Sequence, residues 1–199
     1  MILFSTAENY ILEDERVLLR PLSEKDFTHL LPFAENEAGL WKHSMVSAAG
    51  EEGMKKYIEK ALSQRLSGIE YPFIVFDKRL NAYAGSTRFY DIQMANQSLQ
   101  LGYTWYGKKF QGTGLNVQCK FLLLSFAFES AGMWRVEFRA DARNARSIAA
   151  MKKIGCKEEG VLRQHTPLDD GTRRDSIILS ILKNEWENGV KEILKNLLE

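Results

Sequence analysis

The chain has 199 residues, of which 45% are hydrophobic and 27% are charged, and its formal net charge is +1. This composition predicts one domain over residues 1–199, and the near-neutral charge excludes binding to nucleic acid or an anionic membrane through the overall field of the molecule. Cys119 and Cys156 lack the spacing of a metal site or a disulfide scaffold, which favours a cytoplasmic setting.

A short apolar run predicts a strand over residues 16–22, and Ser23 followed by Asp26 predicts the start of a helix. Pro32 lies within this helix and is expected to kink or divide it. Apolar residues at helical spacing around residues 54–62 predict a second helix, which ends at Gly68. Three strands joined by short antiparallel turns are then expected at residues 72–77, 84–92 and 97–106.

A glycine-rich loop over residues 107–114 leads into a long helix that is expected to end near Gly132, and residues 134–139 alternate as a strand. A strand, a long helix and another strand in this order imply a right-handed crossover with parallel pairing. The later elements are a helix over residues 144–154, a hairpin of residues 161–166 with 174–182, and an amphipathic C-terminal helix over residues 185–198. The fold class is therefore α/β, with a mixed, largely antiparallel sheet and one central parallel crossover.

The glycine-rich loop is a candidate anion site. The first amides of a helix have no internal partner and carry partial positive charge, and glycine lets the backbone approach a phosphate closely. The loop ends in Gln111, Gly112, Thr113 and Gly114, without the Lys-Ser/Thr pair of a nucleotide P-loop. A purely structural turn is the alternative.

Further motifs connect this loop to a known family. They are Gln111-x-x-Gly114 at the start of a long helix, Asn144-x-x-Ser147 at the start of a short helix, Glu159-Gly160-Val161-Leu162-Arg163, Asp170-Gly171, Arg174-Asp175 and Glu185-Trp186. Together they resemble the GNAT superfamily of N-acetyltransferases, and in particular its Rim-type branch, which includes enzymes that acetylate the N-termini of ribosomal proteins. The resemblance covers about residues 16–186. It implies a GNAT-like acyl-CoA N-acyltransferase fold, with acetyl-CoA as co-substrate and no metal.

The resemblance also implies which residues hold acetyl-CoA. Backbone groups of the strand before the loop would contact the pantetheine arm of acetyl-CoA. Amides of the loop would contact its pyrophosphate, and the short helix would contact the pantetheine arm from the far side. These positions are Tyr103, Thr104, Trp105, Gln111, Gly112, Thr113, Gly114, Asn116, Asn144 and Ser147. For Tyr103 and Trp105, plain core packing is an equal alternative, and for Asn144 a helix cap is a compatible one.

The sequence departs from the family pattern at two positions. Asn116 stands where the loop usually has its last Gly or Ala, and Met151 stands where many members have the tyrosine that protonates the leaving thiolate. Ser147, the serine of the Rim-type motif, is the expected proton donor in its place; its alternative is a small packing residue.

The candidate general bases are His165, which titrates in the right range, and Glu137, whose strand parity separates it from Val136 and Phe138. Each has a structural alternative, as a hydrogen-bonded surface histidine or a paired carboxylate, and water could carry the proton instead. Arginines cluster nearby, and Arg143 or Arg146 could meet the 3′-phosphate of CoA, although most of the cluster is expected to be a solvated face.

The predicted function is the transfer of an acetyl group from acetyl-CoA to a primary amine, either a peptide N-terminus or a small molecule, by direct attack in a ternary complex. A non-catalytic acyl-CoA-binding module is the alternative, motivated by Met151. The acceptor cleft is expected between residues 35–50 and 166–172, with Trp41 and His43 as candidate lining residues. We expect no nucleic-acid or membrane partner, and a monomer or a homodimer.

Overall fold

The computed structural model describes residues 4–42, 44, 46–168 and 171–198. Its strands form a mixed sheet in the order β1-β2-β3-β4-β5-β6-β8-β7, in which β5 and β6 are parallel and the other neighbours are antiparallel. The strands are β1 Leu12–Glu13, β2 Val17–Pro21, β3 Tyr71–Asp77, β4 Ala82–Gln93, β5 Ser98–Tyr106, β6 Arg135–Asp141, β7 Lys157–Pro167 and β8 Arg173–Leu182. This topology confirms the predicted fold class.

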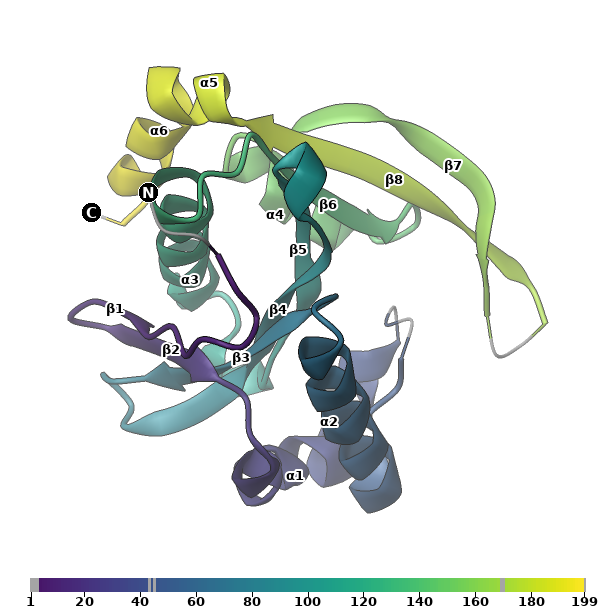
Figure 1. Cartoon of the computed structure of the whole chain (residues 1–199). Helices are drawn as coiled ribbons and strands as arrows, with labels where there is room; N and C mark the ends of the chain where they lie inside the picture. The colour runs from purple at the N-terminus through teal and green to yellow at the C-terminus, as the bar shows by residue number, and fades with distance from the viewer. Residues whose placement is uncertain (1–3, 43, 45, 169–170, 199) are drawn as a thin grey trace.

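Helices cover the two faces of the sheet unequally (Figure 1). The helices are α1 Phe27–Asn36, α2 Gly50–Leu66, α3 Leu115–Ser125, α4 Ala145–Lys153, α5 Lys183–Glu185 and α6 Lys191–Asn196. Figure 1 shows α1 and α2 together on one side, and α3 beside the C-terminal helices on the other, while the hairpin of β7 and β8 extends away from the body of the domain. One face of the β6–β8 half therefore stays open.

The burial pattern of β6 reflects this unequal cover. Val136, Phe138 and Ala140 are buried, whereas Glu137 and Arg139 between them are only partly buried. An alternating pattern of this kind is typical of a strand with one face on the core and one toward water. It confirms the predicted parity of Glu137.

The two parallel strands pair over only a short length. Their register runs from Ser98↔Arg135 to Gln100↔Glu137, although β5 continues to Tyr106 and β6 to Asp141. Beyond this point the strands diverge, and β6 keeps antiparallel pairing with β8 as far as Asp141↔Ser176. The edge of β5 that faces the gap is left with backbone groups that no strand pairs.

Pro32, which was expected to kink or divide its helix, does not divide it, because α1 continues through this proline to Asn36. Leu30, Phe33 and Ala34 are buried on both sides of it. The packing of α1 on α2 therefore outweighs the cost of about 3 kcal/mol that an interior proline carries.

The C-terminal segment is not the single helix predicted over residues 185–198. Asn188 and Gly189 have non-helical backbone angles, with φ of 154° at Gly189, so the helix breaks before α6 begins. Trp186 and Val190 are buried in the core, whereas Ile193 is 45% exposed. The strand β1 was not predicted, and β7 begins at Lys157, before the predicted start at residue 161.

Candidate active site

A cavity of about 750 Å³ opens where β5 and β6 separate. It is bounded by the diverging halves of these strands, by the glycine loop with the first turns of α3, and by α4. Its lining includes Tyr103, Thr104, Trp105, Gln111, Gly112, Gly114, Asn116, Asn144 and Ser147 from the predicted cofactor contacts. The structure thus brings these dispersed residues together around one space.

A bulge in β5 shapes the wall of this cavity. Ser86 pairs with Trp105 and Arg88 with Gly102, so two residues of β5 oppose one of β4. Tyr103 lies at the bulge with a φ of 48°, and the hydroxyls of Thr87 and Thr104 are 2.7 Å apart across it. A bulge interrupts the ladder and redirects backbone groups, so the segment around Tyr103 and Thr104 can present them to a ligand.

The glycine loop forms the other end of the cavity. Gly112 and Gly114 have φ of 76° and 85°, a region that glycine adopts without a steric cost. Within the described residues, no acceptor is found for the backbone N–H groups of Gly112, Thr113, Gly114 or Asn116. Because these amides precede or begin α3, they fit the pyrophosphate of acetyl-CoA in charge and in donor chemistry.

Gln111 contributes to this loop through its side chain. The backbone N–H of Gln111 donates to the carbonyl of Lys108 at 3.1 Å. In the side chain, Nε2 donates to Tyr106 O at 2.7 Å and Oε1 accepts from Arg146 at 2.8 Å. Gln111 therefore closes the loop and ties it to α4. Arg16 was predicted only as the first residue of a strand. It lies directly before β2, and its side chain donates to the carbonyl of Thr113 at 2.8 Å, so it tethers the loop.

The short helix α4 begins as predicted. The Asn144 side chain accepts a hydrogen bond from the Ser147 N–H at 3.1 Å, which is the geometry of an N-cap. Ser147 and Met151 both line the cavity one turn apart, and the Met151 thioether has no proton to give. Arg143 is held by the carboxylate of Asp141 at 2.8 Å, and this ion pair lowers the pKa of Asp141 to about 2.

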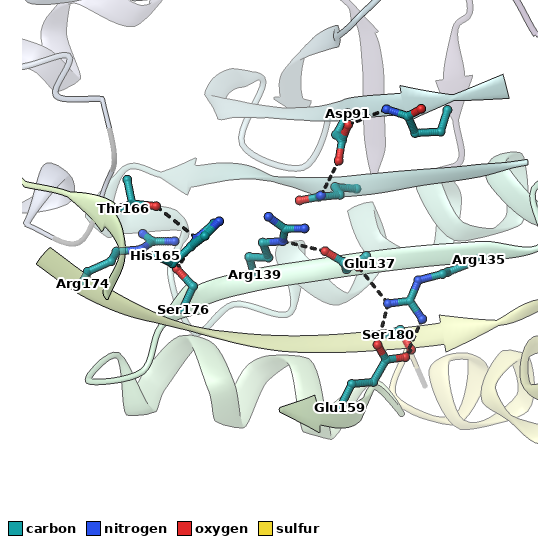
Figure 2. Close-up of polar contacts among 12 residues, drawn as sticks. Asp91, Arg135, Glu137, Arg139, Glu159, His165, Thr166, Arg174, Ser176 and Ser180 are labelled. Atoms are coloured by element: carbon teal, nitrogen blue, oxygen red, sulfur yellow. Dashed lines mark hydrogen bonds and ion pairs between the residues drawn. The ribbon is translucent and has the colours of Figure 1, made fainter. Parts of the chain in front are cut away.

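The two candidate bases lie on the open face of the sheet and do not line the cavity (Figure 2). Glu137 accepts from Arg135 at 2.8 Å and from Arg139 at 2.6 Å, so it is a paired carboxylate. His165 on β7 lies 3.1 Å from the hydroxyl of Ser176, and Arg174 donates to the same hydroxyl at 3.0 Å. Arg139 and Arg174 do line the cavity, so the histidine is one side chain removed from it.

Partial burial, followed by the positive charges of nearby arginines, lowers the pKa of His165 below its usual 6.5. The imidazole is therefore neutral at neutral pH and able to accept a proton. The arginine cluster is largely neutralised by the ion pairs on Glu137 and Asp141.

Trp41, a candidate for the acceptor cleft, is buried, packs against Trp105 at a ring distance of 4.9 Å and is among the residues that line the cavity. His43 lies outside the described residues, as do Asp169 and Asp170 of the predicted acceptor hairpin. Cys119 is fully buried, and burial raises the pKa of its thiol to about 12, so this thiol is protonated near neutral pH.

Two buried basic residues of the cavity were not among the predicted site residues: Lys120 of α3 and Arg174 of β8, each 5% exposed. A signal for Lys120 was present in the sequence. It follows the apolar Cys119 and precedes Leu123 and Leu124 by one helical turn, so it lies on or beside the buried face. The sequence marked Arg174 only as part of the Arg174-Asp175 motif, to which no role in the site was assigned.

A split sheet with an amide-rich loop at one end of the gap is the arrangement expected for an acyltransferase that binds an acyl-CoA. Residues 16–157 match the family described as Acetyltransferase (GNAT) domain. The chain therefore belongs to the GNAT acetyltransferase family and is an acetyltransferase enzyme. Members of this family use acetyl-CoA as co-substrate.

Similar proteins agree with this assignment. The chain is 27% identical over 180 residues to "Putative ribosomal N-acetyltransferase YdaF" of Bacillus subtilis (strain 168), an alignment that covers 87% of this chain and 95% of that protein. A GCN5-related N-acetyltransferase from Brucella melitensis shares the fold with a TM-score of 0.87 at 24% identity, over 96% of this chain and 86% of the other. RimL, described as a ribosomal L7/L12 alpha-N-protein acetyltransferase, shares it with a TM-score of 0.77 at 20% identity, over 91% and 98%.

The described residues offer no candidate for a membrane-spanning helix or for a metal site. None of their helices has both the length and the apolar character needed to cross a membrane. Nor do three or more of their His, Cys, Asp and Glu side chains gather into a group that could hold a metal ion.

Proposed function

We propose that this enzyme transfers the acetyl group of acetyl-CoA to a primary amine by direct attack in a ternary complex. The observation that carries the proposal is the continuity of one cavity from the amides of the glycine loop to Arg174 at the open face of the sheet. Such a space can hold a long, anionic cofactor at one end and an acceptor at the other. Holding both reactants in contact supplies much of the catalytic advantage.

In this proposal the cofactor is bound chiefly by the backbone. The amides of Gly112, Thr113, Gly114 and Asn116 hold the pyrophosphate, and the unpaired edge of β5 holds the pantetheine arm. The Asn144 side chain caps α4 with its oxygen, which leaves its Nδ2 hydrogens available to the arm from the other side.

The chemistry requires a donor where negative charge develops and a proton for the departing sulfur. The bulge at Tyr103 and Thr104 offers backbone N–H groups to the thioester carbonyl. The Ser147 hydroxyl, which faces the same cavity, is our candidate proton donor to the sulfur.

The acceptor amine must lose a proton before or during attack, since an α-amine of pKa near 8 is mostly protonated at pH 7. We propose His165 as the base, acting through water, because it is neutral and lies beside the cavity residue Arg174. Glu137 is the weaker candidate because two arginines already occupy its carboxylate.

The acceptor is a peptide N-terminus or a small amine. The names of YdaF and RimL favour the N-terminus of a ribosomal protein as the first acceptor to assay. Such a substrate places the enzyme in the cytoplasm. The formal net charge of +1 and the polar character of the open face give no support for a nucleic-acid partner.

The proposal is tested by titrating acetyl-CoA in a calorimeter and by a screen of amines for release of free CoA. Saturable binding with amine-dependent thiol release is expected. If acetyl-CoA gives no binding heat at high protein concentration, the proposed function is wrong. Binding without turnover on any amine would instead support the non-catalytic alternative.

A further inference from the structure

Lys120 is a buried lysine that faces the cavity. Its Nζ donates a hydrogen bond to Thr104 Oγ1 at 3.1 Å and lies 5.6 Å from the centre of the Phe138 ring. Within the described residues no carboxylate lies within ion-pair distance of this amine. Most buried charges are paired, because an isolated charge in a low-dielectric interior is costly.

Among the described residues, no element packed around Lys120 supplies a compensating charge. β5 contributes Thr104 and β6 contributes Phe138, while the titratable groups that face the amine are Cys119 on its own helix and Cys156 after α4. Burial raises the pKa of both thiols to about 12, so both are uncharged near neutral pH. A positive charge at Lys120 is therefore unbalanced until a negatively charged group enters the cavity.

The amine lies where the cofactor and the reacting centre are expected to meet. Thr104, its hydrogen-bond partner, belongs to the β5 bulge. On the other side, the Lys120 amine interacts electrostatically with the thiol of Cys156, whose N–H donates to the carbonyl of Met151 in α4 at 3.1 Å. Lys120 thus has access to a cavity wall on which Met151 provides no proton.

We propose that Lys120 is a catalytic residue whose ammonium group stabilises the negative charge leaving with the thioester sulfur and gives that sulfur its proton. This inference rests on the proposed function and assigns to that site a second proton donor besides Ser147.

Atoms and charge are conserved in this step. The lone pair of the acceptor amine forms a C–N bond to the acetyl carbon, the C–S bond breaks, and its electron pair stays on sulfur. Lys120 passes one proton to the sulfur, which leaves CoA as a thiol and the lysine neutral. The acylated nitrogen loses one proton to water, and Lys120 regains one proton from water.

The proton affinity of Lys120 suits this step. Burial lowers the pKa of Lys120 from 10.5 to about 8, close to that of an ordinary thiol at about 8.5. Proton transfer between groups of matched pKa is close to balanced in free energy. The tyrosines of the same cavity are poorer donors, since burial raises the pKa of Tyr90 and of Tyr103.

The test compares the wild-type protein with Lys120→Met, which removes the amine and keeps the volume, and with Lys60→Met on the exposed side of α2 as the matched control. A first readout needs no turnover: the thiolate absorbance of CoA bound to excess protein is followed against pH. We expect the bound thiol to ionise at lower pH than free CoA in the wild type and in the control, and this shift to disappear in Lys120→Met.

The second readout is steady-state kinetics. In Lys120→Met we expect kcat to fall about 100-fold, acetyl-CoA affinity to change by less than about threefold, and the alkaline limb of the kcat profile near pH 8 to vanish. The inference is overturned if the variant keeps kcat within about twofold, or if its bound thiol titrates as in the wild type. If the wild type itself neither binds acetyl-CoA nor transfers acetyl, the proposed function has failed, and the inference with it.

Discussion

Replacing Lys120 by methionine should stabilise the folded protein. The side chain is buried, and its pKa is lowered from 10.5 to about 8 because burial disfavours the charged form. Each pKa unit corresponds to about 1.4 kcal/mol, so the ammonium costs the folded state about 3 kcal/mol at neutral pH. Methionine fills a similar volume without a charge and should recover most of this free energy.

The pH dependence gives this prediction a second signature. Below pH 8 Lys120 is protonated in both states, and the full cost applies. Between about pH 8 and 10.5 the unfolded chain holds a proton that the folded protein has released, so wild-type stability rises with pH through this window. The advantage of Lys120→Met should therefore be greatest at pH 7 and shrink toward pH 10.

Urea denaturation at several pH values measures this effect. With a denaturant slope of about 2 kcal/mol per molar, a gain of about 3 kcal/mol moves the midpoint upward by about 1.5 M. Lys60→Met, on an exposed helix face, should leave the midpoint nearly unchanged. A variant no more stable than the wild type at pH 7, or a gain that does not depend on pH, would refute the reasoning that an uncompensated charge is buried here.

Four further predictions concern the cofactor site and the base. Ser147→Ala should lower kcat on the order of 100-fold and spare acetyl-CoA affinity; unchanged kcat removes the hydroxyl from the mechanism. Asn144→Ala should cost about 1 kcal/mol of stability through the lost cap and weaken acetyl-CoA binding, while Asn144→Asp should retain the stability when both are compared by denaturation and calorimetry. Gly114→Ala should weaken acetyl-CoA binding about tenfold, because its φ is 85° and the new Cβ would lie 3.1 Å from Arg16 Nη1; equal calorimetric affinity contradicts this reading. Because the pKa of His165 is lowered, the acid limb of the wild-type kcat profile should lie below pH 6.5, and His165→Gln should lower kcat and abolish this acid limb; an acid limb that persists excludes this base.

The parts of the fold that depend on local pattern were predictable from the sequence. The alternation of Val136 and Phe138 with Glu137 fixed the inner face of β6, and Asn144 marked the start of α4 because its cap is a local interaction. The glycines likewise predicted a loop that leads into a long helix, and the structure has this loop at the start of α3, with positive φ at Gly112 and Gly114. These features depend only on interactions between residues that are close in the sequence.

The features that the sequence did not reveal arise from tertiary packing. The bulge at Tyr103 depends on register with β4, and the continuation of α1 through Pro32 depends on its packing against α2. The break at Gly189 depends on how Trp186 and Val190 pack against the body of the protein. The spacing of Lys120 from Leu123 and Leu124 indicates a position on or beside the buried face of α3, but the contacts of its amine with Thr104 and Phe138 depend on how α3 packs on the sheet.

The central claim is that one cavity joins acetyl-CoA to an acceptor amine. It is tested most directly by incubating the protein with acetyl-CoA and a set of peptide N-termini and small amines, and by measuring free CoA and N-acetylated product together. Equal amounts of both are expected for at least one amine, and both should form about tenfold more slowly in Gly114→Ala at limiting acetyl-CoA. Tight binding of acetyl-CoA without amine-dependent product from any acceptor class would contradict it.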